Sequence, residues 1–238
     1  MPALALANAS ASSWPAAWPA RVGRGAANSE ATVSRAEELI GRCKAGDTAA
    51  FRELFALHRS DVLRLVQRML GTSGDLEDVV QEVFLQVHRS IKDFRGSARF
   101  TTWLYRLTVN VVLMHRRAAR SRPAFTDSLD AHDARDERPA PDEQVARMAR
   151  IRAFYRLLDR LSDKKRVVFV LHELEGMPPA EIAKVVGAPV LTVRTRLFYA
   201  RRELAQLLRD EPALAALADL FVPEAVGAPL SEPRKGSA

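Results

Sequence analysis

The spacing of apolar and polar residues along most of the chain is that of amphipathic helices. Between residues 34 and 210, apolar positions recur three and four residues apart, and no stretch convincingly shows the two-residue alternation of a half-buried strand. One apolar stripe is continuous and consists of Leu76, Val79, Val80, Val83, Phe84 and Val87. The pattern therefore predicts an all-α fold.

Cap and turn residues divide this pattern into two helical blocks. Asp47 is placed to cap one helix and Gly71 to end it, and residues 92–99 (KDFRGSAR) predict a loop before a helix at about 100–117. Between the blocks, residues 123–143 carry seven acidic residues and three prolines, a composition typical of an extended, flexible linker.

The sequence therefore predicts two small helical domains joined by a flexible acidic linker. The predicted boundaries are a disordered N-terminal extension at 1–30, a first helical domain at 31–120, the linker at 121–143, a second helical domain at 144–210 and a C-terminal tail at 211–238. Because each helical block is small, neither is expected to be very stable alone.

The second block ends in a helix, a tight turn and a further helix. Pro179 suits a first helical position, Gly187 is a turn residue and Pro189 opens the last helix. The apolar stripe of that last helix is Val193, Leu197, Ala200, Leu204 and Leu208. This arrangement is a helix-turn-helix. The face of its second helix opposite the apolar stripe is not needed for the core.

That remaining face combines positive charge with aromatic rings. It consists of Arg194, Thr195, Phe198, Tyr199 and Arg202. Such residues suit the major groove of DNA, where arginine binds guanine edges and phosphates and an aromatic ring contacts a thymine methyl group. A merely solvated basic face is the alternative, and exposed Phe198 and Tyr199 argue against it.

The first block contains an arginine-rich stretch with aromatic residues. Residues 95–122 hold seven arginines and no acidic residue, and Arg106, Asn110 and Arg117 flank the edge of the predicted helix where Trp103 lies. Aromatic rings beside arginine suit unpaired bases, which stack on rings while arginine neutralises phosphate. Trp103 is equally compatible with the core face, which is predicted to be Phe100, Trp103, Leu104, Leu107, Val111 and Met114.

Charge and single residues refine this picture. The 36 Lys and Arg residues outnumber 29 Asp and Glu residues, which favours a polyanionic partner. Cys43 is the only cysteine and is expected to be a buried structural thiol, whereas His58, His88 and His115 are expected at the surface or as caps. No apolar run reaches the ~20 residues of a membrane span and the N-terminus lacks a signal peptide pattern, so we expect a cytoplasmic protein without membrane insertion.

An enzyme is one alternative, and the sequence gives it little support. Asp75, Asp78 and Glu82 could approach a metal ion, but no histidine stands at a matching spacing. The segment HELEG begins as a zinc-protease helix does, yet Gly176 occupies the second histidine position. We therefore expect no catalytic residue, no metal and no cofactor.

Three segments together resemble the signature segments of the extracytoplasmic-function (ECF) group of bacterial sigma factors, in the sigma-70 family. They are DLEDVVQEVFLQVHR, FRGSARFTTWLYRLTVN and LHELEGMPPAEIAKVVGAPVLTVRTRLFYARREL. Their order and spacing match the family, and the resemblance covers roughly residues 34–210. It implies that the first domain is sigma region 2, that the second is sigma region 4, and that the protein directs core RNA polymerase to promoters and promotes opening of the −10 element.

The resemblance also implies binding residues. Those implied for the −10 element are Phe94, Arg95, Ser97, Arg99, Thr102, Trp103, Arg106 and Asn110. Those implied for the −35 element are Pro189, Leu191, Thr192, Arg194, Thr195, Phe198, Tyr199 and Arg202. Those implied for polymerase binding are Asp75, Asp78, Gln81 and Glu82.

The implied partners are promoter DNA, both duplex and single-stranded, and core RNA polymerase. The acidic face is expected to dock on the β′ clamp helices, region 4 on the β flap, and the linker to thread toward the active-site channel. Many members of the family are held inactive by an anti-sigma factor, which makes such a protein a further candidate partner.

Two positions depart from the family pattern, and two other functions stay open. Leu191 stands where glycine is common in the turn, and Tyr199 stands where a basic residue is frequent, so the exact −35 preference is open. A stand-alone helix-turn-helix regulator is the main rival, but it does not explain Trp103, Asn110 or the acidic face. An adaptor that binds only proteins leaves the arginine excess unexplained.

Overall fold

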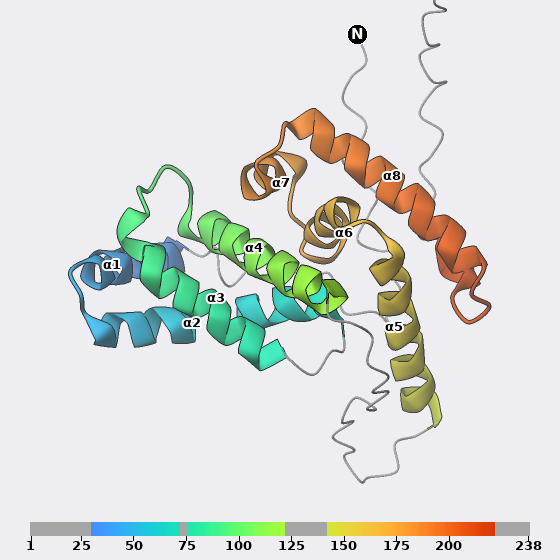
Figure 1. The fold of residues 1–238 in the computed structure, drawn as a ribbon, viewed down its shortest axis with the longest axis horizontal. Helices are drawn as coiled ribbons and strands as arrows, with labels where there is room; N and C mark the ends of the chain where they lie inside the picture. The colour runs from blue at the N-terminus through green and yellow to red at the C-terminus, as the bar shows by residue number, and fades with distance from the viewer. Residues whose placement is uncertain (1–29, 72–75, 122–141, 222–238) are drawn as a thin grey trace, which may run out of the picture.

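The computed structural model describes residues 30–71, 76–121 and 142–221, and every regular element within these ranges is helical (Figure 1). The first half forms α1 (Glu30–Lys44), α2 (Thr48–Leu70), α3 (Leu76–Ser90), the 3₁₀ turn η2 (Ile91–Asp93) and α4 (Phe100–Ser121). The second half forms α5 (Asp142–Arg160), α6 (Asp163–Phe169), the π-helical turn η3 (Val170–Leu174), α7 (Pro179–Val186), α8 (Val190–Arg209) and the 3₁₀ turn η4 (Ala215–Phe221). The all-α prediction is confirmed.

Several sequence predictions lie outside the described residues. They are the position of Asp75, the N-terminal extension up to residue 29, the linker over 122–141 and the tail beyond Phe221. The last two residues of the predicted linker, Asp142 and Glu143, belong to α5.

α2 is the centre of the first unit, which comprises α1 to α4, and it contacts the other three helices. The predicted stripe of α3 is buried from Val79 to Val87, as expected for a helix with one apolar face. The stripe predicted for α4 is partly wrong. Tyr105, Val109 and Val112 face the core, whereas Met114, predicted to be buried, is 64% exposed.

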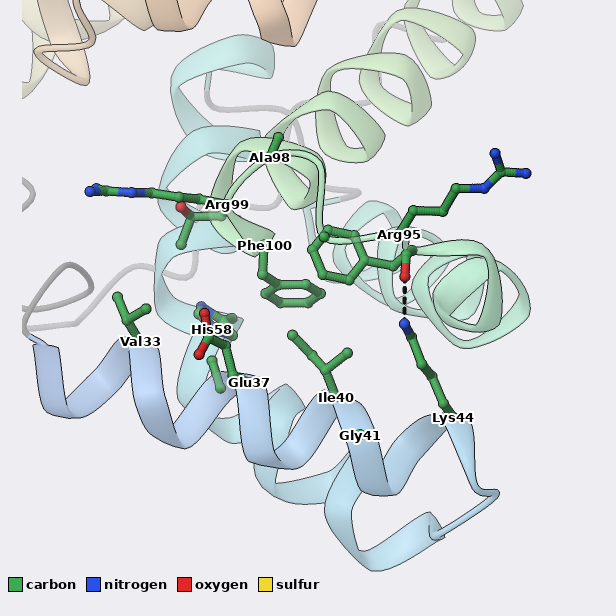
Figure 2. Close-up of a pocket in the computed structure, with 14 residues that line it drawn as sticks. Val33, Glu37, Ile40, Gly41, Lys44, His58, Arg95, Ala98, Arg99 and Phe100 are labelled. Carbon is green, nitrogen blue, oxygen red and sulfur yellow. Dashed lines mark hydrogen bonds between the residues drawn. The ribbon is translucent and has the colours of Figure 1, made fainter.

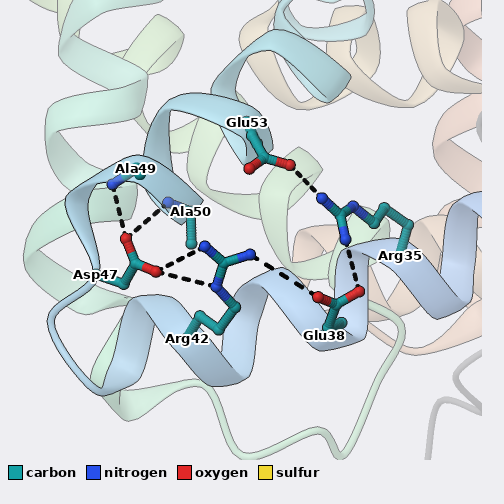
Figure 3. Close-up of polar contacts among 7 residues, drawn as sticks. All are labelled: Arg35, Glu38, Arg42, Asp47, Ala49, Ala50 and Glu53. Atoms are coloured by element: carbon teal, nitrogen blue, oxygen red, sulfur yellow. Dashed lines mark hydrogen bonds and ion pairs between the residues drawn. The ribbon is translucent and has the colours of Figure 1, made fainter.

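The turn between α1 and α2 is fixed by Asp47, which caps α2 as predicted. Its carboxylate accepts hydrogen bonds from the backbone N–H groups of Ala49 (2.8 Å) and Ala50 (3.1 Å). Arg42 donates two further bonds to the same carboxylate, at 2.8 and 2.9 Å (Figure 3). These hydrogen bonds, the one from Ala50 first, hold the pKa of Asp47 below its usual range.

α8 is the centre of the second unit, which comprises α5 to η4, and it contacts α5, α6, α7 and η4. Its predicted apolar stripe, Val193, Leu197, Ala200, Leu204 and Leu208, is buried. Leu214, Ala218 and Phe221 are also buried in the cluster that α8 forms with α5. The second unit therefore continues to Phe221, into the segment that the sequence assigns to the tail.

The turn between α7 and α8 has the predicted chemistry. Pro179 occupies the first position of α7, where a missing N–H group leaves no hydrogen bond unmade. Gly187 follows α7 with a left-handed backbone (φ 63°), which a residue with a side chain would adopt only at a cost, and its N–H group bonds the carbonyl of Ala183. This turn sets the direction in which α8 leaves.

The two units pack against each other and share one apolar core. Leu171 and Ile182 of the second unit belong to the same buried cluster as Leu65 and Val80 of the first. α4 contacts α7, and α2 contacts η3, and Figure 1 shows α4 running beside α7. This contact between the units is not anticipated by the sequence.

Two single-residue predictions have opposite outcomes. Cys43 is buried, as predicted, and burial raises the pKa of its thiol, which keeps it protonated. His58, predicted at the surface or as a cap, is buried in α2, so that prediction is wrong.

Candidate nucleic-acid interface

The outer face of α8 exposes the aromatic and basic residues that the sequence singled out. Phe198 is 41% exposed and Tyr199 49%, and their rings meet edge to face with centroids 5.4 Å apart. Arg194 and Arg202 are exposed, and no ion pair joins either to another described residue. Their charge is therefore available to a ligand beside exposed aromatic surface.

The start of α8 also projects toward solvent. Pro189 is exposed, Thr192 is half-buried, and Leu191 is 74% exposed. Thr195 lies one turn further on, and its hydroxyl donates to the carbonyl of Leu191 at 3.0 Å. Leu191, which departs from the family pattern, thus adds apolar surface to this end of the helix.

A second candidate surface begins at the loop between η2 and α4. Gly96 has a positive φ of 72°, which permits the tight bend. Lys44 of α1 binds the loop. Its Nζ donates a hydrogen bond to the backbone carbonyl of Phe94 at 2.5 Å and lies 5.6 Å from the centre of the Phe94 ring. The loop side chains left exposed are those of Arg95, Ser97 and Arg99.

The aromatic residues of this surface form one cluster. Phe94, Phe100 and Trp103 have ring centroids between 5.3 and 5.7 Å apart. Phe100 is buried, whereas Phe94 and Trp103 are half-buried. Trp103 therefore fits both interpretations of the sequence, as a core residue and as a surface for bases. It packs against the core, and it is only half-buried.

A pocket of about 340 Å³ opens between this loop and α1 (Figure 2). Phe94 and Phe100 line it from the loop side, and Ile40 and Lys44 line it from α1. Its volume is within the range of small-ligand sites, which is about 300–1,000 Å³. The sequence did not indicate the residues from α1, because α1 and the loop are about 50 residues apart in the chain.

The exposed ridge of α4 continues the surface. Arg106 and Asn110 are exposed, and no ion pair joins Arg106 to another residue in the described ranges. Met114, one turn beyond Asn110, extends the ridge with apolar surface. Thr102 is 8% exposed, so it offers almost no surface for direct contact.

Part of the arginine-rich stretch serves the contact between the units. Arg116 is buried and lies 2.7 Å from Asp159 and 3.1 Å from Asp163. Arg120 also binds Asp163, at 2.8 Å. Although burial alone would raise it, these arginines hold the pKa of Asp163 below its usual range. Two arginines that the sequence associated with DNA are thus neutralised within the protein.

A polar, acidic face lies on the outer side of α3. Asp78 and Gln81 are exposed, and Glu82 is exposed with Arg89 3.9 Å away. This face is opposite the buried stripe of the helix, as the periodicity predicts. It lies on a different helix from the basic surfaces, which are on α4 and α8.

The described ranges contain neither a metal-binding cluster nor a helix able to span a membrane. No group of three or more His, Cys, Asp or Glu residues there is arranged to hold a metal ion. None of the helices in the described part of the chain has the length and apolar character to span a bilayer.

Two regions of the chain match known sequence families. Residues 54–122, which run from α2 to just beyond α4, match Sigma-70 region 2. Residues 151–204, which run from α5 into α8, match Sigma-70, region 4. The two matches thus fall on the two packed units.

Named relatives cover most of the chain. The ECF RNA polymerase sigma-E factor of Escherichia coli (strain K12) is 34% identical over 174 residues, which is 70% of this chain and 90% of the relative. The RNA polymerase sigma-H factor of Pseudomonas aeruginosa is 30% identical over 185 residues, 75% and 96% of the two chains. A solved structure of CnrH in complex with the cytosolic domain of CnrY matches with a TM-score of 0.54 and 28% identity, and it covers 74% of this chain and 99% of that one.

Proposed function

The chain belongs to the ECF group of the sigma-70 family of RNA polymerase sigma factors, and from this premise we propose how its surfaces divide the work of transcription initiation. In this proposal, the outer face of α8 binds the −35 element as duplex DNA. The loop at residues 94–99 and the ridge of α4 hold bases of the −10 element after the strands separate. The acidic face of α3 binds core RNA polymerase.

The assignment of α8 to duplex DNA is supported by its shape and chemistry. A single exposed helix fits the major groove, and arginine can bind guanine through two hydrogen bonds there. Arg194 and Arg202 have no competing ion pair within the described residues, and Phe198 supplies apolar surface for a thymine methyl group.

The assignment of α4 to unpaired bases is supported by the half-buried Trp103 and the exposed Asn110. The part of the indole that is left accessible offers ring surface on which a base can stack, at about 1–3 kcal/mol per base. An amide can read the edge of a base that has lost its partner. The pocket beside Phe94 is a concave place for such a base.

The assignment of α3 to the polymerase is supported by a face of exposed acidic and amide groups, on a helix other than the two that carry the basic surfaces. Docking on the β′ clamp helices would leave α4 and α8 free for DNA. The proposal has three further parts. The second unit contacts the β flap of the polymerase, and the protein acts in the cytoplasm. An anti-sigma factor controls it. In keeping with the non-catalytic role of the family, the chain contributes specificity and the polymerase the chemistry.

One observation carries the proposal: each of the two packed units exposes its own basic and aromatic face. We expect the isolated protein to bind promoter duplex weakly and specific transcripts to appear only when it is added to core polymerase. Run-off transcription from matched promoters, with core alone as the control, measures this. Tight, specific binding by the isolated protein with no effect on core would favour a helix-turn-helix regulator instead.

A further inference from the structure

The outer ridge of α4 carries one large apolar side chain, that of Met114, which is 64% exposed. α4 continues to Ser121, so Met114 lies well inside a regular helix. Single exposed apolar residues are common on protein surfaces and need no function of their own. What distinguishes Met114 is the row of residues to which it belongs.

That row contains the residues proposed to hold unpaired bases. At about 100° per residue, Met114 is rotated around the helix axis by about 20° from Trp103 and by about 40° from Asn110. It lies about 6 Å beyond Asn110 along the axis and about 16 Å beyond Trp103, at about 1.5 Å per residue. A DNA strand that follows the ridge from Trp103 therefore reaches Met114 after about five nucleotides, at about 3.4 Å each.

The charges along this row suit the phosphates of DNA. Arg106 and Arg117 are exposed on either side of Met114 along the ridge, and no ion pair joins either of them to another residue in the described part of the chain. The stretch from residue 95 to residue 122 contains no acidic residue that would repel DNA. Met114 thus lies between two available positive charges, on a surface that a polyanion can cover.

The two ends of the ridge differ in shape. The loop end has the pocket of about 340 Å³ beside Phe94, which suits a base that has left the stack. At the other end, Met114 extends from the exposed side of a helix. Such a side chain does not enclose a base, but it can lie against the face of a base pair. Methionine is among the apolar residues that proteins insert between base steps, and its unbranched thioether adapts to irregular surfaces.

We propose that Met114 is a wedge at the junction between the upstream duplex and the opened −10 strand. This inference rests on the proposed function, in which α4 holds the bases of the −10 element and α8 holds duplex further upstream. The thioether covers the face of the last base pair, Arg117 binds a phosphate on the paired side, and Arg106 binds one on the opened side. Apolar contact with Met114 replaces the stacking that this pair loses when its neighbour opens, so the strands close more slowly.

Met114→Ala in the full-length protein, assembled with core polymerase, tests the wedge. Two labelled DNAs separate the junction from the unpaired bases. One is a fork whose duplex ends at the upstream edge of the −10 element, and the other is a single-stranded −10 oligonucleotide. By fluorescence anisotropy, we expect Met114→Ala to bind the fork about tenfold more weakly than the wild type, because the apolar cover of the last pair is lost. Its affinity for the single strand should not change.

Met148→Ala is the matched control, because Met148 is a 43% exposed methionine on another helix, α5. It should bind both DNAs as the wild type does. Met114→Leu should keep most of the affinity for the fork, since leucine is apolar and similar in volume. Equal affinity of Met114→Ala and Met148→Ala for the fork would overturn the wedge.

Two further outcomes are distinct from this one. An equal loss of affinity for the fork and for the single strand in Met114→Ala would also overturn the wedge, because Met114 would then contact the strand without acting at the junction. If the wild type with core polymerase binds neither DNA, the proposed function is wrong, and the wedge is rejected with it.

Discussion

At the scale of single residues, the buried His58 is the least expected feature. Its ring lies 5.2 Å from that of Phe100, and neither ring nitrogen has a hydrogen-bond partner in the described structure. Burial lowers the pKa of His58, and the nearby charge of Asp61 only partly opposes this effect. The ring is therefore held neutral in the folded protein.

This neutral histidine should make stability depend on pH. Below the ordinary pKa of 6.5, the unfolded chain binds a proton at His58 that the folded chain does not, so stability falls as the pH falls. We expect the free energy of unfolding of the wild type to decrease between about pH 6.5 and pH 5. His58→Leu should decrease less over the same interval, measured by urea unfolding. Parallel curves for the two proteins would contradict the assignment.

The burial of His58 could have been predicted from the sequence, whereas the exposure of Met114 could not. Leu54, His58, Val62 and Leu65 follow each other at helical spacing, and all four are buried in α2. On α4, however, the buried stripe includes polar residues. Its position therefore cannot be predicted from the spacing of apolar residues alone. Thr108 enters the core because its hydroxyl donates to the carbonyl of Leu104 at 2.9 Å.

At the scale of elements, the helix ends were predictable because their chemistry is local. A cap such as Asp47 or a turn residue such as Gly187 acts on backbone groups within a few residues of itself. The same holds for the two faces of α8, since its apolar stripe fixes which residues remain outside. The part that α1 plays in the pocket was not predictable, because it depends on packing between distant segments.

The outer face of α8 should be replaceable without loss of fold. Arg194→Ala removes an exposed side chain that pairs with no other described residue, so stability should change by no more than about 0.5 kcal/mol. Discrimination between bases of the −35 element should fall by about 1–3 kcal/mol if the arginine binds a guanine edge. Competition binding with duplexes that differ at single positions measures this. Arg209→Ala, in the last turn of the same helix, is the control, and equal effects of the two variants would remove Arg194 from the site.

The ridge of α4 should act at a later step than α8. Asn110→Ala removes an exposed amide, so polymerase association should persist while strand opening at the −10 element slows. Permanganate reactivity of unpaired thymines in the promoter measures opening. A template with a pre-formed bubble bypasses this step and should restore transcription by the variant. Normal reactivity on intact duplex would contradict a role for Asn110.

At the scale of the whole molecule, the contact between the units could not be predicted from the sequence. Arg68 of the first unit donates a hydrogen bond to Glu175 of the second at 2.7 Å, yet the two are 107 positions apart, and nothing in either local pattern indicates the other. Arg116 stood in a stretch that the sequence associated with DNA, yet it is committed to Asp159 and Asp163 of the second unit. In a stretch of like charges, the structure is therefore needed to tell which residues form internal ion pairs and which remain exposed.

The distinction between internal ion pairs and exposed charges also predicts where core polymerase can bind. The outer face of α3 is exposed and takes no part in the ion pairs between the units, so it should be available to polymerase while the units are packed together. Asp78→Arg reverses an exposed charge there and should weaken association with core polymerase without unfolding the protein, since surface changes of this kind cost little stability. Co-purification with core polymerase at several salt concentrations measures the loss.

Asp219→Arg makes the same charge reversal on η4, where the carboxylate is 87% exposed, and should leave association unchanged. If both variants reduce association equally, the effect is one of net charge, and α3 has no special role. If only Asp78→Arg does so, the loss is local to the face of α3, and the result supports the assignment of that face to polymerase binding.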